Sequence, residues 1–209
     1  MSSIAQDLRF GLHVITHPLD GFWDMKHENR GRLWVAIAGI VSMALTSVFS
    51  KETTAFLFGG SATPKTDLIT EFTKVLILFL LVCVANWSVT TLLDGEGTFK
   101  DIVMTFGYSC LPVTLINIPK ALLTNVCTYS ESAYIGLMSA AAIIWFIGLL
   151  FFGLMTVHQY SFGKMLLTTV ATIAAAAVLT FVYLLFFSLI TQMGTFIATV
   201  IREISFRTR

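Results

Sequence analysis

The chain has 209 residues, of which 56% are hydrophobic and only 12% charged, and its mean hydropathy is +0.83. An ordinary soluble domain carries about 25% charged residues, so the composition excludes that class and indicates an integral membrane protein. The net charge of +1 gives no reason to expect nucleic acid as a partner.

The first 32 residues are too polar to cross a membrane. A helix near the start would place four aliphatic side chains on one face: Ile4, Leu8, Leu12 and Ile15. This pattern predicts an amphipathic helix at the membrane surface, ended by His17-Pro18 and followed by Trp23 as an interfacial anchor.

Five long apolar runs follow, at about residues 33–50, 75–93, 102–118, 134–157 and 165–190. A spanning helix needs about 20 apolar residues, so we predict an all-α, polytopic transmembrane helical bundle with five spans over residues 33–190. Residues 191–209 continue with a helical apolar pattern at three- and four-residue spacings, on Met193, Phe196, Ile197, Val200, Ile201 and Ile204. This predicts a C-terminal amphipathic helix, matching the N-terminal interfacial segment over residues 1–32.

A four-span alternative arises because Pro112 interrupts the third run. If that run dips into the membrane and returns, nine of the 13 basic residues share the side of both termini; with five spans the division is six to seven. The positive-inside rule therefore favours four spans, whereas hydropathy favours five.

Small residues recur at close-packing positions in three of the spans. These candidates are Ala38, Ser42 and Thr46 in the first span, Gly136 and Ala140 in the fourth, and Ala171 and Ala175 in the fifth. Such stripes allow two helices to approach closely.

The polar stretch LLDGEGTFKD separates the second and third runs, and it lacks the spacing of either a phosphate-binding loop or a calcium loop. Gly95 and Gly97 predict a tight turn by permitting backbone angles that other residues resist. Thr98 is a candidate cap for a helix starting at Phe99, with Asp101 in its first turn. A role in docking a partner is compatible with this turn, and would involve Asp94, Gly95, Glu96, Gly97, Phe99, Lys100 and Asp101.

Asn86 lies near the middle of the second span, on one helical face with Cys83, Thr90 and Asp94. Such a polar stripe should face protein or a wet cavity. Interhelical hydrogen bonding is the favoured explanation, and a substrate pathway is the alternative.

Chemical sites have little support in the sequence. His13 and His17 have helical spacing for a metal pair, but no H-E-x-x-H pattern is present, and no hydrolase motif appears. The three cysteines read as small apolar groups. We predict no catalytic residue, no cofactor and no metal, and therefore no enzyme.

Three stretches together resemble bacterial members of the Yip (Ypt-interacting protein) membrane family: HPLDGFWDMKHENRG, NWSVTTLLDGEGTFKDIVMTFGYSCLP and TVHQYSFGK. The central block falls on Asn86, Asp94 to Gly97, Phe99 to Asp101, Gly107, Tyr108 and Pro112. The resemblance implies five spans, a bacterial plasma-membrane location and a cytoplasmic N-terminus. Eukaryotic relatives bind Rab-type GTPases, an activity that we do not carry over.

Bacterial relatives of this subtype resemble companions of carbohydrate ABC importers. The resemblance therefore implies a non-enzymatic accessory subunit whose partners are membrane lipids and importer permeases. Two alternatives stay open: a small permease or channel lined by the Asn86 face and the Pro112 kink, and a membrane-shaping scaffold.

Overall fold

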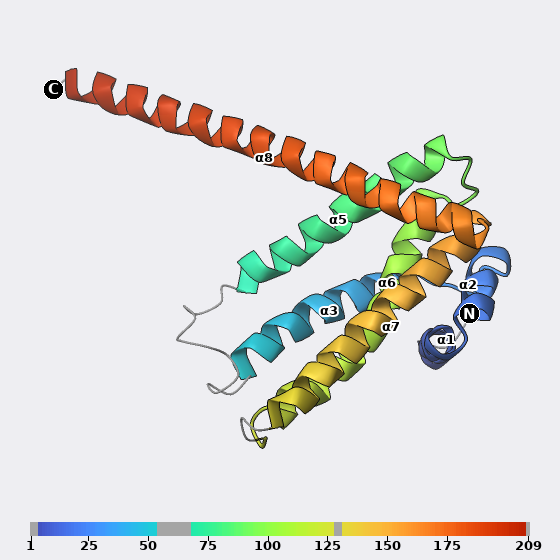
Figure 1. Cartoon of the computed structure of the whole chain (residues 1–209). Helices are drawn as coiled ribbons and strands as arrows, with labels where there is room; N and C mark the ends of the chain where they lie inside the picture. The colour runs from blue at the N-terminus through green and yellow to red at the C-terminus, as the bar shows by residue number, and fades with distance from the viewer. Residues whose placement is uncertain (1–3, 54–67, 128–130, 208–209) are drawn as a thin grey trace.

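The computed structural model describes residues 4–53, 68–127 and 131–207, and every regular element in these ranges is a helix. The described helices are α1 (Ile4–Thr16), α2 (Pro18–His27), α3 (Leu33–Thr53), α5 (Leu68–Leu92), α6 (Phe99–Leu123), α7 (Ser132–His158) and α8 (Phe162–Arg207) (Figure 1). Five of them, α3 and α5 to α8, are long and apolar enough to cross a membrane. The predicted all-α bundle of five spans is confirmed.

The connections alternate between the two ends of the bundle. The short helices α1 and α2, the turn between α5 and α6, and the corner between α7 and α8 lie together at one end, at the right of Figure 1. We call this the N-terminal end. The turn that follows α6 lies at the opposite end of the bundle.

The third span is one continuous helix, so the dip-and-return alternative does not describe the structure. α6 runs through Pro112 and Pro119 to Leu123, beyond the expected end at residue 118. Proline removes a backbone donor and usually kinks a helix, but membrane helices tolerate it where neighbouring helices and Ser or Thr side chains compensate. Here α6 packs against α3, α5 and α7, and the Thr114 hydroxyl donates to the Cys110 carbonyl at 3.4 Å.

α3 and α6 approach most closely at three small residues. A methyl group at Gly107 would lie 2.5 Å from the Cα of Ala36, and one at Gly39 would overlap the Gly107 carbonyl. Farther along the same interface, the hydroxyls of Ser42 and Thr114 lie 3.2 Å apart. The absence of side-chain volume therefore sets the separation of these two helices.

The N-terminal helices belong to the core of the fold. Val14 of α1 and Phe22 and Met25 of α2 are buried in one apolar cluster with Val35 and Tyr108. Meanwhile Ile4, Leu8 and Leu12 stay exposed on the outer side of α1. α1 thus has one buried face and one apolar face that is free to meet the membrane surface.

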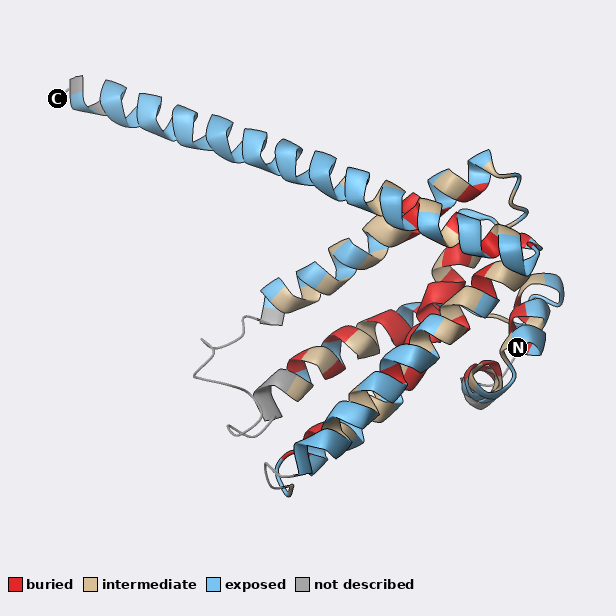
Figure 2. Ribbon diagram, in the orientation of Figure 1, coloured by how far each residue is buried: buried red, intermediate tan, exposed pale blue. Residues whose placement is uncertain are grey.

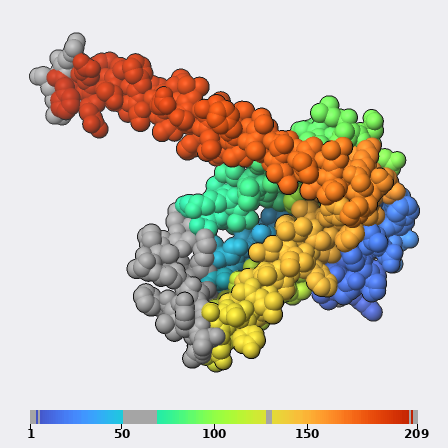
Figure 3. All heavy atoms as spheres, viewed as in Figure 1, coloured from blue at the N-terminus to red at the C-terminus, as the bar shows by residue number. Residues whose placement is uncertain are grey.

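α8 is a single helix of 46 residues, so the fifth span and the expected C-terminal amphipathic segment are continuous. At 1.5 Å per residue it is about 69 Å long, more than twice the roughly 30 Å hydrocarbon thickness of a bilayer. Its first part packs on α5, and every residue described from 180 to 204 is exposed. Figures 2 and 3 show this second part projecting from the bundle.

Candidate functional site

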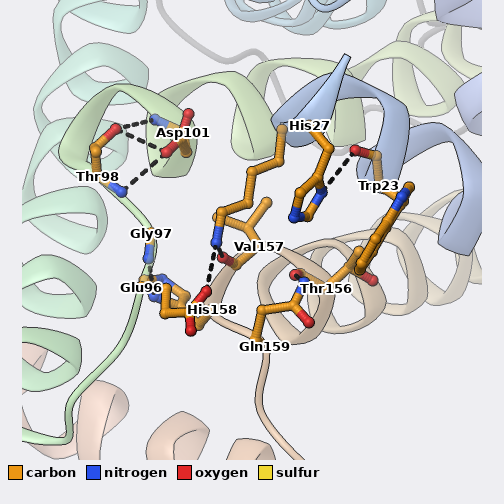
Figure 4. A network of polar contacts seen from close by, with 11 residues as sticks. Trp23, His27, Glu96, Gly97, Thr98, Asp101, Thr156, Val157, His158 and Gln159 are labelled. Atoms are coloured by element: carbon orange, nitrogen blue, oxygen red, sulfur yellow. Dashed lines mark hydrogen bonds and ion pairs between the residues drawn. The ribbon is translucent and has the colours of Figure 1, made fainter. Parts of the chain in front are cut away.

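A polar junction forms at the N-terminal end, where the 93–98 turn meets α2 and the corner between α7 and α8 (Figure 4). The turn follows α5 and leads directly into α6. Four spans and one interfacial helix therefore converge on a few residues, which makes this the best-defined polar site in the described part of the chain.

The start of α6 is fixed by a reciprocal pair of hydrogen bonds. The Asp101 backbone N–H donates to the Thr98 hydroxyl at 3.3 Å, and the Thr98 N–H donates to the Asp101 carboxylate at 2.9 Å. This is a capping box, in which two otherwise unpaired backbone donors are satisfied. The predicted cap at Thr98 and the helix start at Phe99 are confirmed.

The glycines of the turn are needed for space. The left-handed residue is Asp94, with φ 53°, and neither Gly95 nor Gly97 has a φ in the left-handed region. A methyl group at Gly95 would lie 2.6 Å from the ring of His158, and one at Gly97 would lie 2.7 Å from it. The expectation that these glycines serve unusual backbone angles was wrong, because close contact with a distant side chain requires them instead.

His158 forms the floor under the turn. It is buried at the last position of α7, and its Nδ1 accepts a hydrogen bond from the Gly97 N–H at 3.2 Å. That contact places the ring proton on Nε2, and Nε2 is buried without a partner among the described residues. Sequence reasoning missed this contact, since 61 residues separate its partners.

Tyr160 closes the other side of the turn. Its hydroxyl donates to the carbonyls of Thr90 and Leu93, at 3.3 and 3.1 Å, and so caps the C-terminus of α5. Burial raises the pKa of Tyr160, and the nearby Asp94 carboxylate adds to this effect. The hydroxyl therefore stays protonated and remains a donor.

Lys26 attaches α2 to this junction. Its Nζ donates to the Val157 carbonyl at 2.6 Å and lies 3.4 Å from the Glu96 carboxylate. The ammonium thus satisfies a carbonyl near the end of α7, where a cation is favourable, while Glu96 stays largely exposed at the surface.

Asn86 lies in a separate contact within the membrane-spanning region. Its Nδ2 donates to the Thr172 hydroxyl of α8 at 3.3 Å, and its Oδ1 is buried without a partner among the described residues. Asn86 and Thr90 are each 1% exposed, and Cys83 is fully buried. The polar face of α5 therefore meets protein and carries an interhelical hydrogen bond.

Comparison with known proteins identifies the family. The family model described as the Yip1 domain matches residues 12–201. This chain belongs to the Yip1 family. No curated protein and no solved structure matches it.

The Yip1 match agrees with the family resemblance drawn from the sequence, and with five apolar helices the chain is a multi-pass membrane protein. Such a protein contacts lipids. Within this Yip1 chain the quoted central block divides into two groups. Asp94 to Asp101 form the turn and the start of α6, with Lys100 exposed, whereas Gly107, Tyr108 and Pro112 are buried inside the bundle.

Tyr108 has a structural contact in the Yip1 fold. Its hydroxyl accepts the backbone N–H of Arg32 at 3.1 Å, next to the start of α3. Together with the Gly107 contact to Ala36, this connects the middle of α6 to the beginning of the first span.

The close-packing candidates have different surroundings. Thr46 is buried, Ser42, Ala171 and Ala175 are half-buried, and Ala38, Gly136 and Ala140 are exposed. Nothing lies within 4 Å of a methyl group built on Gly136. For the three exposed residues, close packing against a helix of another protein stays a prediction.

His13 of α1 and His17, the residue between α1 and α2, stack with ring centroids 5.2 Å apart. In the described part of the chain, no group of three or more His, Cys, Asp or Glu side chains is placed to hold a metal ion.

Proposed function

We propose that this Yip1-family protein is a non-enzymatic accessory subunit, whose long last helix packs against the transmembrane helices of another membrane protein. The observation that supports this most is the exposed apolar length of α8. Lipid covers about 30 Å of such a helix. The 46 residues of α8 extend over about 69 Å.

The part of α8 that extends beyond the fifth span, from residue 191 onward, has a defined apolar face. Met193, Ile197 and Val200 are all exposed, as are Phe196, Ile201 and Ile204. An apolar surface left in water costs about 25 cal/mol per Å², so several such side chains favour association. Exposed apolar patches of this kind mark interaction sites in proteins.

α7 supplies a second exposed face. Gly136 and Ala140 share it with exposed Ile143, Ile144 and Ile147, and a methyl group added at Gly148 would also have no neighbour within 4 Å. Small residues on a membrane helix let a second helix approach closely. Since lipid tails can also cover this face, it supports the proposal less than α8 does.

The partner that we propose is the permease pair of a carbohydrate ABC importer in a bacterial plasma membrane. The support is the resemblance of the three quoted stretches to bacterial Yip relatives of that subtype. With the N-terminus in the cytoplasm, the 93–98 turn would also be cytoplasmic, and the exposed Glu96 and Lys100 would be available to the importer.

A permease or channel has less support. Its path would need to reach Asn86 and Tyr108, which are 1% and 0% exposed. Both side chains form hydrogen bonds within the bundle. Such burial is typical of a structural interface.

The experiment is purification of the tagged full chain in gentle detergent, followed by mass spectrometry. We expect importer permease and ATPase subunits in stoichiometric amounts, and an Ile197→Asp variant should lose them. Thr195→Asp is the matched control, because 195 lies on the opposite face of the helix. Recovery of the protein alone, or equal loss in both variants, would contradict the proposal.

A further inference from the structure

A cavity lies between α1 and the turn that joins α2 to α3. Its volume is about 590 Å³, within the range of small-molecule sites. Three arginines line it, Arg9, Arg30 and Arg32, together with Asn29, Gln6, His13 and Phe10; Asp7 is the acidic group of the lining. Guanidinium and amide groups are among the donors of this lining, and such groups suit an anion.

The arginines differ in how many of their donors already form ion pairs with acidic side chains. Arg30 uses Nη1 for Asp24, at 2.9 Å, and Nε for Glu28, at 3.4 Å. These two contacts hold the guanidinium and leave its Nη2 group available. Arg9 forms no hydrogen bond or ion pair with any described residue, and it is exposed at the cavity.

The charges around the cavity balance as a whole, although Arg9 itself is not paired with any described residue. The three arginines are balanced by Asp7, Asp24 and Glu28, and Arg32 Nε lies 3.9 Å from the Asp7 carboxylate. The attraction would come from directed donors. A guanidinium presents its donors in a planar fork that matches two oxygens of a phosphate, which an ammonium cannot reproduce.

The cavity lies beside the start of the first span α3, where we expect the membrane surface. On the other flank of α1, Leu8 and Leu12 line an apolar groove of about 240 Å³ with Leu111 and Leu115 of the spanning helix α6. Trp34, near the start of α3, is 42% exposed and donates its indole N–H to Asp7 at 3.2 Å. Tryptophan is typical of the membrane–water interface, and here it holds a wall of the cavity.

We propose that this cavity binds the phosphate of an anionic phospholipid headgroup, with Arg9 and Arg30 as the principal donors. A free phosphate offers the same chemistry. The apolar groove on the adjoining flank of α1 and the interfacial position of Trp34 favour the lipid. This site is independent of the proposed role of α8.

The test uses the full chain in nanodiscs of phosphatidylcholine, with and without phosphatidylglycerol, and counts the retained lipid by native mass spectrometry. Both lipids carry a phosphodiester, but the choline cation of phosphatidylcholine would meet the unpaired charge of Arg9. We therefore expect preferential retention of phosphatidylglycerol, reduced about tenfold by Arg9→Gln, which removes a charged hydrogen bond. Arg9→Lys should recover only part of it, because the fork is lost. Lys100→Gln and Arg202→Gln remove a charge from exposed positions outside the cavity and should retain wild-type binding.

A second arm separates the two sources of phosphate. Inorganic phosphate and glycerol phosphate at millimolar concentration should not displace the lipid; displacement would overturn the lipid assignment in favour of a soluble anion. An equal loss of retained phosphatidylglycerol in the control variants would show that general surface charge causes the binding. That result would overturn the proposed site. Unchanged retention in Arg9→Gln, with the protein still folded by thermal unfolding, would also overturn it.

Discussion

At the 93–98 turn, the absence of a single side-chain carbon allows parts of the chain that are far apart in sequence to come into contact. Gly97 lies against His158 and Val157, and Gly95 lies against His158 and Tyr160. The local part of this arrangement could be predicted, because Thr98 and Asp101 are three residues apart and their capping box is a short-range pattern. The role of His158 could not, because nothing local to it indicates a partner in the 93–98 turn.

Gly97→Ala should destabilise the protein by about 1–3 kcal/mol, the usual cost of adding volume to a packed site. Its methyl group would lie 2.7 Å from both His158 and Val157. Thermal unfolding in detergent measures the effect. Gly163→Ala, in the first turn of α8 where no atom lies within 4 Å, is the control and should be neutral or stabilising. Equal unfolding temperatures for both variants would show that the turn does not pack on α7 as described.

At the scale of helices, hydropathy located all five spans, but the contacting faces were less predictable. The stripe of Ala38, Ser42 and Thr46 repeats every four residues, and such a stripe turns about 40° around the helix at each step. Ala38 is consequently exposed while Thr46 is buried. The closest approach of α3 to α6 instead uses Ala36, Gly39 and Gly107, and only a view of both helices could reveal it.

The α3–α6 interface predicts a strong effect for Gly107→Ala. The added methyl group would meet the backbone of Ala36, which cannot rotate away, so the helices must separate. We expect a loss of about 3 kcal/mol or more, at the upper end of overpacking costs, measured by unfolding in detergent. Gly148→Ala on α7 has free space and serves as the matched control. A Gly107→Ala protein as stable as the control would contradict the observed separation of these helices.

The α5–α8 contact predicts a modest coupling between Asn86 and Thr172. Double-mutant cycles for hydrogen bonds between membrane helices average about 0.6 kcal/mol. A cycle with Asn86→Ala and Thr172→Ala should give a coupling of that order. Strict additivity of the two substitutions would mean that the 3.3 Å contact contributes nothing.

For the whole molecule, five crossings place the N-terminal end and the end of α8 on opposite sides of the membrane. The distribution of basic residues favoured four spans, because it counts charges without knowing that α6 continues through its prolines. The continuity of α8 was also unpredictable from periodicity, since apolar and amphipathic patterns can share one helix. The proposed partner would account for the length of that helix.

Cysteine labelling tests this topology. In a Cys127→Ser background, a cysteine at Glu96, whose side chain is 67% exposed, and one at Arg202 should react from opposite sides of sealed vesicles. Cys83 and Cys110 are buried and should stay silent. Labelling of both positions from the same side would exclude five crossings.

The central claim, that the second part of α8 is a protein contact face, is tested most directly by photo-crosslinking in native membranes. A photoreactive residue at Ile197, which is 53% exposed on the apolar face, should yield a crosslinked product with a second protein. The same residue at Thr195, on the opposite face, should yield little. Protein adducts from 197 alone would support the accessory role and identify the partner by mass spectrometry. Only lipid adducts at both positions would contradict the account.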